Sequence, residues 1–389
     1  MKLEPTIKPD REIHNRFAVD FEFRVIFSDR VFDPENPVLL EQMPTAHDGP
    51  ARAIVFVDRG VASPDLIESI SAFFEINAFR VTLVSKPVIV TGGEASKSTD
   101  DVFNLAVKTL NDVALDRHSY VVIVGGGAVL DAVGFASAVV HRGLRTIRLP
   151  TTVLAQNDAG IGVKNGIDRF GKKNFLGTFA PPWAVINDFT LLEKLPAHHW
   201  RDGIAEAIKV ALIRDRPFFD WIEKNLDALV SRDEPSMRRM IFRCAELHLN
   251  HITTGGDPFE RGSARPLDFG HWSAHKLEQM SNFTLSHGHA VAVGMMIDCA
   301  YARSIGLLDS PSELRIRNCL ERAGFEMDVG RRLQLKKSDL NNLLAGLDEF
   351  QEHLGGRLSI TMLKSIGTAR ELDEIDREAM LNSLEQILF

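Results

Sequence analysis

The sequence predicts an α/β domain with a parallel sheet, followed by a mainly α-helical domain. In the first half, apolar runs typical of strands alternate with stretches of helical spacing, which is the pattern of parallel strands joined by crossover helices. From about residue 190, stretches of helical spacing predominate. We therefore expect two domains, residues 1–190 and 191–389, and 389 residues are enough to bury a core in each.

The elements of the first half can be placed in order. Residues 51–58 form a continuous apolar run that suits a buried strand, and residues 63–77 have helical spacing behind a Ser-Pro start. A second strand (79–85), a second helix (99–116) and a third strand (119–127) follow, and the third strand ends in three glycines. This alternation predicts that ligands bind at the carboxyl ends of the strands.

The second half has a different pattern. Its stretches of helical spacing are residues 200–215, 237–252, 289–306 and 312–325. Prolines interrupt the chain before the first of them, so we place the domain boundary between Pro181 and Leu195.

Composition and charge limit the classes of function. With 44% hydrophobic and 25% charged residues, the chain has the composition of an ordinary globular protein. Its net charge of −8 gives no overall basic field, so neither nucleic acid nor an anionic membrane is expected as a partner. The sequence shows no apolar run of membrane-spanning length, no signal peptide, and three widely spaced cysteines. These features predict a cytoplasmic protein with reduced thiols.

The glycine turn at Gly126 and Gly127 suits a dinucleotide, although a simple tight turn is the alternative. Glycines let the backbone approach a ligand, and the helix that follows offers free N–H groups and a positive dipole end to a pyrophosphate. Asp58 ends the first predicted strand, where a carboxylate can accept hydrogen bonds from ribose hydroxyls or cap a helix. A second glycine turn carries Glu94 and Lys97, for which ordinary solvated charges are the competing interpretation.

Histidines cluster in one segment of the second half, as His271, His275, His287 and His289, with Asp268 nearby. Imidazole and carboxylate groups are the expected ligands of zinc and similar ions in a reducing compartment, and a catalytic site keeps three protein ligands and an open position. The spacing alone does not choose the three ligands, because His271 and His275 also fit one face of an ordinary helix.

Glu206 and Lys209 lie three positions apart in a small, apolar helical stretch. Two charges on one face of such a helix indicate either an ion pair at the surface or a buried site.

Taken in order, the motifs of the chain resemble the sugar phosphate cyclase superfamily, whose best-known members are the 3-dehydroquinate synthases. The resemblance extends from about Asp58 to Gly367 and rests on GGEASKS, GGGAVLDAVGF, PTTVLAQNDA, GKKNFLGTF, GIAEAIK, GDPFERG, DFGH and HGHAVAVGM. It implies a dehydroquinate synthase-like fold, a homodimer, NAD as cofactor and one divalent metal ion, zinc or cobalt.

The resemblance also assigns roles to residues. The metal ligands that it implies are Glu206, His271 and His287. The residues that it assigns to NAD are Asp58, Glu94, Lys97, Gly126, Gly127, Asp131, Thr151, Thr152 and Lys173. Those assigned to catalysis are Asp158, Lys164, Lys209, Asp268 and His275. Those assigned to the substrate or its phosphate are Lys164, Asn174, Asp268, His275, His353 and Arg142, the last of which would reach the site of the neighbouring subunit.

The chemistry implied by the resemblance explains why these groups occur together. NAD oxidises one ring hydroxyl to a ketone, which acidifies the adjacent C–H so that phosphate leaves by elimination. NADH then returns the hydride, the ring opens, and an intramolecular aldol reaction closes the carbocycle. The metal holds the substrate hydroxyls as a Lewis acid, while lysines and Arg142 hold the phosphate. The implied enzyme is a phosphate-eliminating carbon–oxygen lyase.

The chain departs from dehydroquinate synthases at three positions. Asn250 stands in place of a lysine, Ala264 in place of an arginine and Asp268 in place of an asparagine. The lost cations are those expected to bind the carboxylate of the dehydroquinate precursor, and Asp268 would repel that carboxylate, so a neutral substrate end is favoured. Arg265 could compensate, which keeps 3-dehydroquinate synthase as an alternative.

Two late segments bear on the substrate. DFGH and FQEHLGGRLSITML resemble the branch that cyclises sedoheptulose 7-phosphate to valiolone-type products, with His353 in place of a phosphate-binding lysine. His275 stands where many of those enzymes have proline, and residues 256–279 also resemble the EboD-type cyclases, so the product is left open. We predict a ketose phosphate cyclase, with 3-dehydroquinate synthase and a metal-dependent polyol or glycerol phosphate dehydrogenase as alternatives.

Overall fold

The first half of the chain forms a parallel sheet, as predicted. The computed structural model describes residues 15–45, 49–255, 259, 266–353, 356 and 358–389, without the side chains of Pro266 and His353. The strands of the sheet are β1 (Arg24–Ser28), β2 (Ala51–Asp58), β3 (Val81–Leu83), β4 (Val88–Val90), β5 (Tyr120–Gly125), β6 (Arg145–Pro150) and β9 (Ala184–Asp188). Their order is β1-β9-β6-β5-β2-β3, β4 also pairs with β2, and every pairing is parallel.

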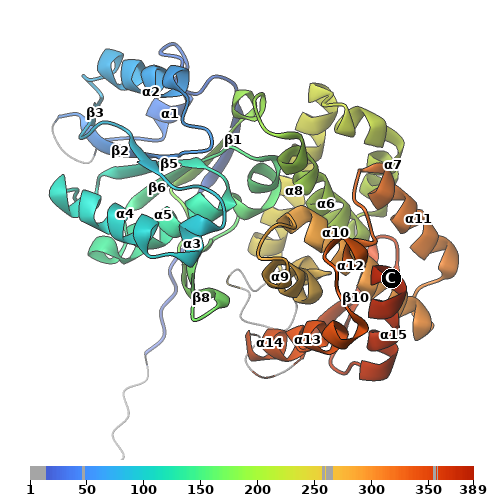
Figure 1. Cartoon of the computed structure of the whole chain (residues 1–389). Coiled ribbons are helices and arrows are strands. Elements are labelled where there is room, and N and C mark those ends of the chain that lie inside the picture. The colour runs from blue at the N-terminus through green and yellow to red at the C-terminus, as the bar shows by residue number, and fades with distance from the viewer. Residues whose placement is uncertain (1–14, 46–48, 256–258, 260–265, 354–355, 357) are drawn as a thin grey trace, which may run out of the picture.

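Helices cover both faces of this sheet (Figure 1). They are α1 (Val38–Glu41), α2 (Pro64–Ile76), α3 (Ala95–Ser98), α4 (Asp101–Asp112) and α5 (Gly127–Val139). Phe73 of α2 belongs to the core on one face, and Leu110 of α4 belongs to the core on the other. The start of α2 is fixed by Ser63, whose side chain accepts a hydrogen bond from the Leu66 N–H, and by a proline at the first helical position.

The order of the strands reverses between β2 and β5. From β2 the chain continues to β3 and β4 on one side, and β5 then returns to the other side of β2, with Val124 opposite Val57. In open α/β sheets ligands bind outside the carboxyl ends of the strands at such a reversal. Asp58 ends β2 at this place, and Gly126 and Gly127 follow β5.

Two features between β6 and β9 interrupt the alternation. A single π-helical turn, η2 (Ala155–Ala159), contains Asp158, and turns of this kind often occur at functional sites. An antiparallel hairpin of β7 (Lys164–Arg169) and β8 (Lys172–Phe179) follows and packs against α5. Neither feature was predicted from the sequence.

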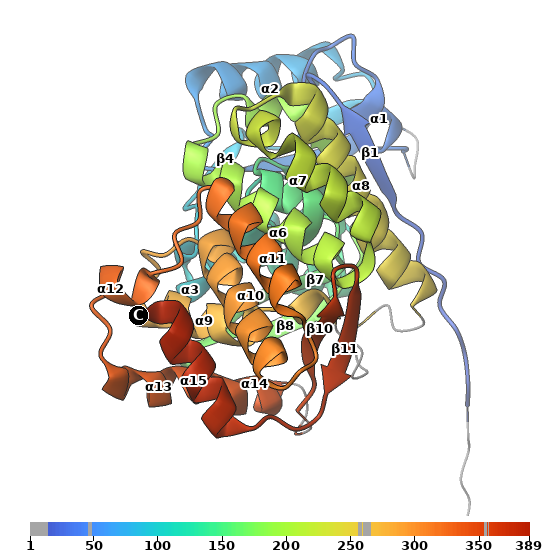
Figure 2. The same ribbon diagram turned by 90° about the vertical axis from the view of Figure 1, so that its right-hand side faces the viewer.

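The second half is mainly helical, as predicted. Its elements are η3 (Phe189–Leu192), α6 (Ala197–Arg214), α7 (Arg216–Val230), α8 (Glu234–Thr254), η4 (Pro266–Asp268), α9 (His271–Met280), α10 (His287–Ser304), α11 (Ser310–Arg322), α12 (Val329–Arg332), η5 (Lys337–Asp339), α13 (Leu340–Leu344), α14 (Gly346–His353), the hairpin β10 (Ile360–Ser365) and β11 (Thr368–Leu372), and α15 (Arg377–Leu388). The central helix α10 is surrounded by α6, α9, α11 and α15 (Figure 2). Among the residues described, no helix has both the length and the apolar character needed to cross a membrane.

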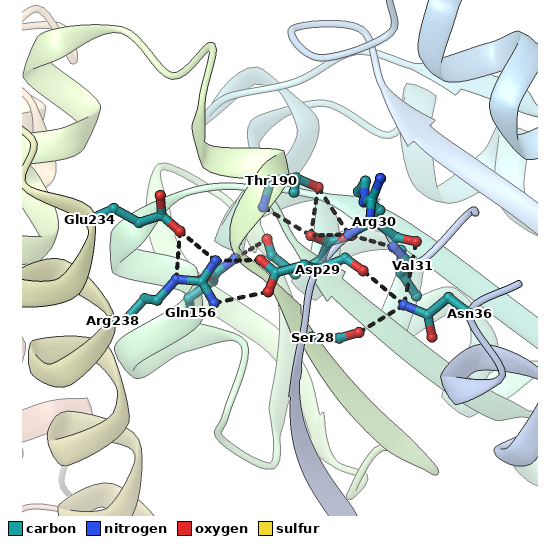
Figure 3. Close-up of polar contacts among 10 residues, drawn as sticks. Ser28, Asp29, Arg30, Val31, Asn36, Gln156, Thr190, Glu234 and Arg238 are labelled. Carbon is teal, nitrogen blue, oxygen red and sulfur yellow. Dashed lines mark hydrogen bonds and ion pairs between the residues drawn. The ribbon is translucent and has the colours of Figure 1, made fainter.

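The two halves pack against each other at the edge of the sheet formed by β1. Arg238 of α8 donates a hydrogen bond to Asp29 Oδ2 at 3.0 Å and to Glu234 Oε1 at 2.7 Å (Figure 3), and its guanidinium lies over the Phe189 ring. Exposed ion pairs of this kind contribute only about 0.2–1 kcal/mol. Phe27 of β1 stacks on Phe189, so apolar packing accompanies the charges. The division of the chain near residue 190 stays a prediction.

Candidate functional site

The structure brings the three predicted metal ligands together from three helices. Glu206 lies in the middle of α6, and His271 and His287 are the first residues of α9 and α10. The Nε2 atoms of His271 and His287 lie 3.8 Å and 3.5 Å from Oε1 of Glu206. One potential ligand atom from each residue lies within 4.8 Å of the others.

The chemistry of this donor set fits a divalent cation. Oε1 of Glu206 is buried and accepts no hydrogen bond from any residue described. His271 Nδ1 lies 3.1 Å from the Phe269 carbonyl oxygen. A carbonyl only accepts, so Nδ1 carries the proton and the Nε2 lone pair is left toward Glu206. Burial and the charge of Lys209 lower the pKa of His271, which favours the neutral ring that a metal requires.

Glu278 is a buried carboxylate behind the metal site that was not predicted from the sequence. Its Oε2 lies 3.3 Å from His287 Nδ1, and its Oε1 accepts a hydrogen bond from Lys173 Nζ at 2.9 Å. Burial disfavours both charges, but Glu278 and Glu206 outweigh it and raise the pKa of His287 to about 10. A bound cation would therefore replace a proton that the two carboxylates otherwise retain. The available signal was the spacing, since Glu278 follows His271 by seven positions on one face of a helix.

His275 lies one turn after His271, with the two ring centroids 5.4 Å apart. His275, Glu278 and His287 form a second group whose ligand atoms are close enough for a cation. Each carboxylate is paired with a lysine, but both oxygens of Glu278 are engaged, Oε1 by Lys173 and Oε2 by His287, whereas Oε1 of Glu206 accepts no hydrogen bond from the residues described. The site built on Glu206 is therefore the better metal centre, and His275 lies beside it.

Lys209 forms an ion pair with Glu206, and both side chains are only 1% exposed. The sequence left a surface pair and a buried site as alternatives, and the structure shows the buried one. Burial disfavours the ammonium, but the charges of Glu206 and Asp158 outweigh it and raise the pKa of Lys209. Asp268, half-buried in η4, adds to this effect.

On the α/β side, glycine-containing segments converge on Asp58. Its Oδ1 accepts a hydrogen bond from the Gly60 N–H at 2.8 Å, and its Oδ2 lies 3.5 Å from the Gly126 nitrogen. A Cβ at Gly92 would lie 1.9 Å from Oδ1, so only glycine fits there. The residues predicted to bind a dinucleotide thus meet where the order of the strands reverses.

The two threonines predicted to bind NAD differ in their surroundings. The hydroxyl of Thr151 is buried and has no hydrogen-bond partner among the described residues, as expected of a group that a ligand completes. The hydroxyl of Thr152 accepts a hydrogen bond from the Ala155 N–H at 3.0 Å and so caps the π-turn.

Lys97 is a buried lysine that contacts the half-buried Asp131 and the exposed Asn174. The ammonium of Lys97 donates to Asp131 Oδ2 at 2.7 Å and to the side-chain oxygen of Asn174. Burial opposes its charge, but Asp131 and Glu94 raise the pKa of Lys97. Lys97 and Asp131, predicted for the cofactor, therefore touch Asn174, predicted for the substrate.

Lys173 connects the cofactor side to the metal side. Its Nζ lies 3.4 Å from Glu94 Oε2 and 2.9 Å from Glu278 Oε1. Since Glu278 also contacts His287, a continuous series of polar contacts joins Glu94 to the metal ligands. Lys173 therefore links Glu94 of the α/β half to Glu278 and His287 of the helical half.

Asp158 pairs with His248 of α8, a second functional residue that was not predicted. His248 Nδ1 lies 2.8 Å from Asp158 Oδ1. Burial disfavours the carboxylate, but Lys209 and His248 lower the pKa of Asp158 well below its usual range. The sequence signal was weak, because His248 is one of two histidines in its helix, with His251.

Two further predicted residues, Lys164 and Arg142, lie at the ends of secondary-structure elements. Lys164 is exposed at the start of β7, and Arg142 is exposed after α5 with φ of 64°. Asn250 is exposed on α8. Ala264, Arg265 and the side chain of His353 lie outside the described residues.

Two family models together match residues 87–347 of the chain. Residues 203–347 match the family model described as 3-dehydroquinate synthase C-terminal, and residues 87–202 match that described as 3-dehydroquinate synthase N-terminal. The 3-dehydroquinate synthase of Blochmanniella floridana is 33% identical over 314 residues, which cover 80% of this chain and 84% of that protein.

Solved structures share the fold over nearly the whole chain. ValA (2-epi-5-epi-valiolone synthase) from Streptomyces hygroscopicus subsp. jinggangensis 5008, solved with NAD+ and Zn2+ bound, has a TM-score of 0.85 at 24% identity and covers 96% of this chain and 99% of its own. 2-Deoxy-scyllo-inosose synthase, complexed with carbaglucose-6-phosphate, NAD+ and Co2+, has a TM-score of 0.77 at 21% identity, with 94% and 96% covered. The chain belongs to the 3-dehydroquinate synthase family, within the sugar phosphate cyclase superfamily.

Proposed function

We propose that this chain binds NAD and one divalent metal ion, zinc or cobalt, and cyclises a ketose phosphate with release of phosphate. Sedoheptulose 7-phosphate is the substrate that we propose, and a valiolone-type cyclitol is the product. The observation that carries the proposal is the convergence of Glu206, His271 and His287, and its connection through Glu278 and Lys173 to the cofactor side. The family and the folds of the valiolone and inosose synthases support it.

The metal would be held by Glu206, His271 and His287. When bound, the metal would supply a Lewis acid for substrate hydroxyls and NAD a reversible hydride acceptor. Lys209 pairs with Oε2 of Glu206, which leaves Oε1 for a ligand. Phe269 and Glu278 each hold the Nδ1 side of a ligand ring, so both Nε2 atoms face Glu206.

Three further residues would handle the substrate. Asp158 is ionised and can accept a hydrogen bond from a sugar hydroxyl. His275, with its ring centroid 6.1 Å from that of His287, is placed to bind phosphate or to move a proton. Lys164 offers an exposed cation for the phosphate dianion.

A neutral substrate end is favoured by the charges around the site. The buried ammonium of Lys209 is already paired with Glu206, and Asp268 adds a negative charge near it. A substrate carboxylate bound near Lys209 would be repelled by Asp268 and Asp158, while the Lys209 ammonium is already paired with Glu206.

The test is a substrate panel with purified protein, NAD+ and Zn2+ or Co2+. Phosphate release from sedoheptulose 7-phosphate, with the cyclitol identified by NMR and no net NADH at 340 nm, is the expected result. Release from the carboxylated heptulosonate phosphate alone would establish the 3-dehydroquinate synthase alternative. Net NADH from a polyol or glycerol phosphate would establish the dehydrogenase alternative. If no member of the panel yields phosphate or NADH, the proposal fails.

We also propose a homodimer in which Arg142 reaches the phosphate of the neighbouring site. Arg142 is exposed at the end of α5, in a left-handed backbone conformation that places it outside the helix. Sedimentation measures the assembly. An Arg142→Ala variant that stays dimeric and raises KM for the sugar phosphate would support the role, and an unchanged KM would contradict it.

A further inference from the structure

His248 is a buried histidine of the helical half that reaches into the α/β half. It is 7% exposed, and its Nδ1 lies 2.8 Å from Oδ1 of Asp158 in the π-turn. Its Nε2 would lie 3.6 Å from a Cβ placed at Gly162. The ring therefore contacts the carboxylate and leaves little room for a side chain at position 162.

The backbone around Asp158 is held independently by Arg148 of β6. The guanidinium is fully buried and donates to the carbonyl oxygens of Gly160 at 3.1 Å and Gly162 at 2.6 Å. It also donates to the side-chain oxygen of Asn165 at 2.8 Å. Since Arg148 fixes the main chain, the rotation of the Asp158 side chain is left to its own partner, which is His248.

We infer that His248 is a positioning residue that holds the Asp158 carboxylate in the orientation needed by the substrate. The inference rests on the proposed function, in which Asp158 binds a sugar hydroxyl. A residue that contacts a substrate-binding side chain fixes the orientation of that side chain. Loss of such a supporting contact typically lowers activity by about 10–100-fold. Residues two positions apart face roughly opposite sides of a helix. On α8, therefore, His248 faces Asp158 and Asn250 faces away from it.

Three single variants test this assignment. His248→Leu removes the imidazole that pairs with Asp158 and should lower kcat by about 10–100-fold with little change in KM. His248→Asn keeps an N–H donor near the position of Nδ1 and should recover much of the loss. Asn250→Ala, the matched control on the exposed face of α8, should stay within about twofold of the wild type. Bound metal should be equal in all three, since Glu206, His271 and His287 are untouched.

A double-mutant cycle shows whether His248 acts through Asp158. In an Asp158→Asn background, His248→Leu should lower kcat no further. A full kcat for His248→Leu, or an equal additional loss in the Asp158→Asn background, would overturn the inference. The same four proteins are compared by melting temperature, which needs no substrate. If the wild type cyclises nothing, the proposed function fails, and additive melting shifts would separately overturn the pairing of His248 with Asp158.

Discussion

Oε2 of Glu278 lies 3.3 Å from Nδ1 of His287, on the opposite side of the ring from Glu206. Because this carboxylate fixes the ring and increases its basicity, Glu278→Gln should weaken metal binding by about 10–100-fold. Competition with a chelating dye measures the affinity. Glu349→Gln is the control, since Glu349 is a half-exposed partner of Lys276. Equal affinities for the two variants would show that Glu278 does not support the ligand.

His271→Ala should abolish stoichiometric metal binding and phosphate release together, because it removes one of three ligands. Metal content by mass spectrometry checks the first effect. His289→Ala is the matched control, since His289 is only half-buried and its Nε2 bonds the Glu326 carbonyl oxygen at 2.7 Å, away from the metal ligands. A His271→Ala protein with a full equivalent of metal would remove His271 from the triad.

Lys209→Met should destabilise the metal-free protein by about 3–5 kcal/mol, the usual cost of leaving one partner of a buried ion pair alone. The reason is that Glu206 would remain buried with its charge uncompensated. Urea unfolding of the chelated protein measures the loss. The double variant Lys209→Met/Glu206→Gln removes both charges and should recover a large part of it. An equal loss in the double variant would contradict this account.

Asp58→Ala should weaken NAD+ binding by about 10–100-fold, the loss expected for hydrogen bonds to a charged group. Quenching of protein fluorescence or calorimetry measures the affinity. Asp65→Ala is the control, because Asp65 is 85% exposed and pairs with Lys194 at the surface. If both variants bind NAD+ as the wild type does, Asp58 only shapes its turn.

Asp298 should make stability depend on pH. Its buried carboxyl accepts hydrogen bonds from the Trp272 indole at 2.8 Å and the Gly270 N–H at 2.9 Å, but burial dominates and raises its pKa to about 7. In the unfolded protein the Asp298 carboxyl loses its proton at a pKa of ~4, whereas in the folded protein it keeps the proton up to about pH 7. Proton binding by Asp298 therefore stabilises the folded state at low pH, and this stabilisation is lost as the pH rises through 7.

The measurement is the free energy of unfolding at pH 5 and at pH 8, for the wild type and for Asp298→Asn. The wild type should lose about 2–3 kcal/mol more than the variant over this range. Parallel pH profiles would mean that Asp298 titrates near its ordinary value.

Much of the fold was predictable because its signals are local. The apolar run that became β2 and the Ser-Pro start of α2 carry their structure in a few adjacent residues. β1 was missed, since its residues are only partly buried and its strand depends on pairing with β9, about 160 positions away. The β10–β11 hairpin was missed for a similar reason, because it lies within a part of the chain dominated by helices.

The candidate site was predictable to a similar extent. Motif order named Glu206, His271 and His287, which come together from separate helices. It could not name Glu278 or His248, because a supporting residue is defined by the contact that it makes and not by its neighbours in sequence. Asn250 was singled out by its departure from the family motif, but it is exposed in this fold.

The position of Lys173 has a thermodynamic consequence. Its ammonium is shared by Glu94 on the cofactor side and Glu278 behind His287. A bound cofactor that moves the Lys173 ammonium toward Glu94 would weaken its contact with Glu278, and Glu278 in turn contacts the metal ligand His287. Coupling between two binding equilibria is reciprocal. The affinity for the metal should therefore change when NAD is bound, and the affinity for NAD should change by the same factor when the metal is bound.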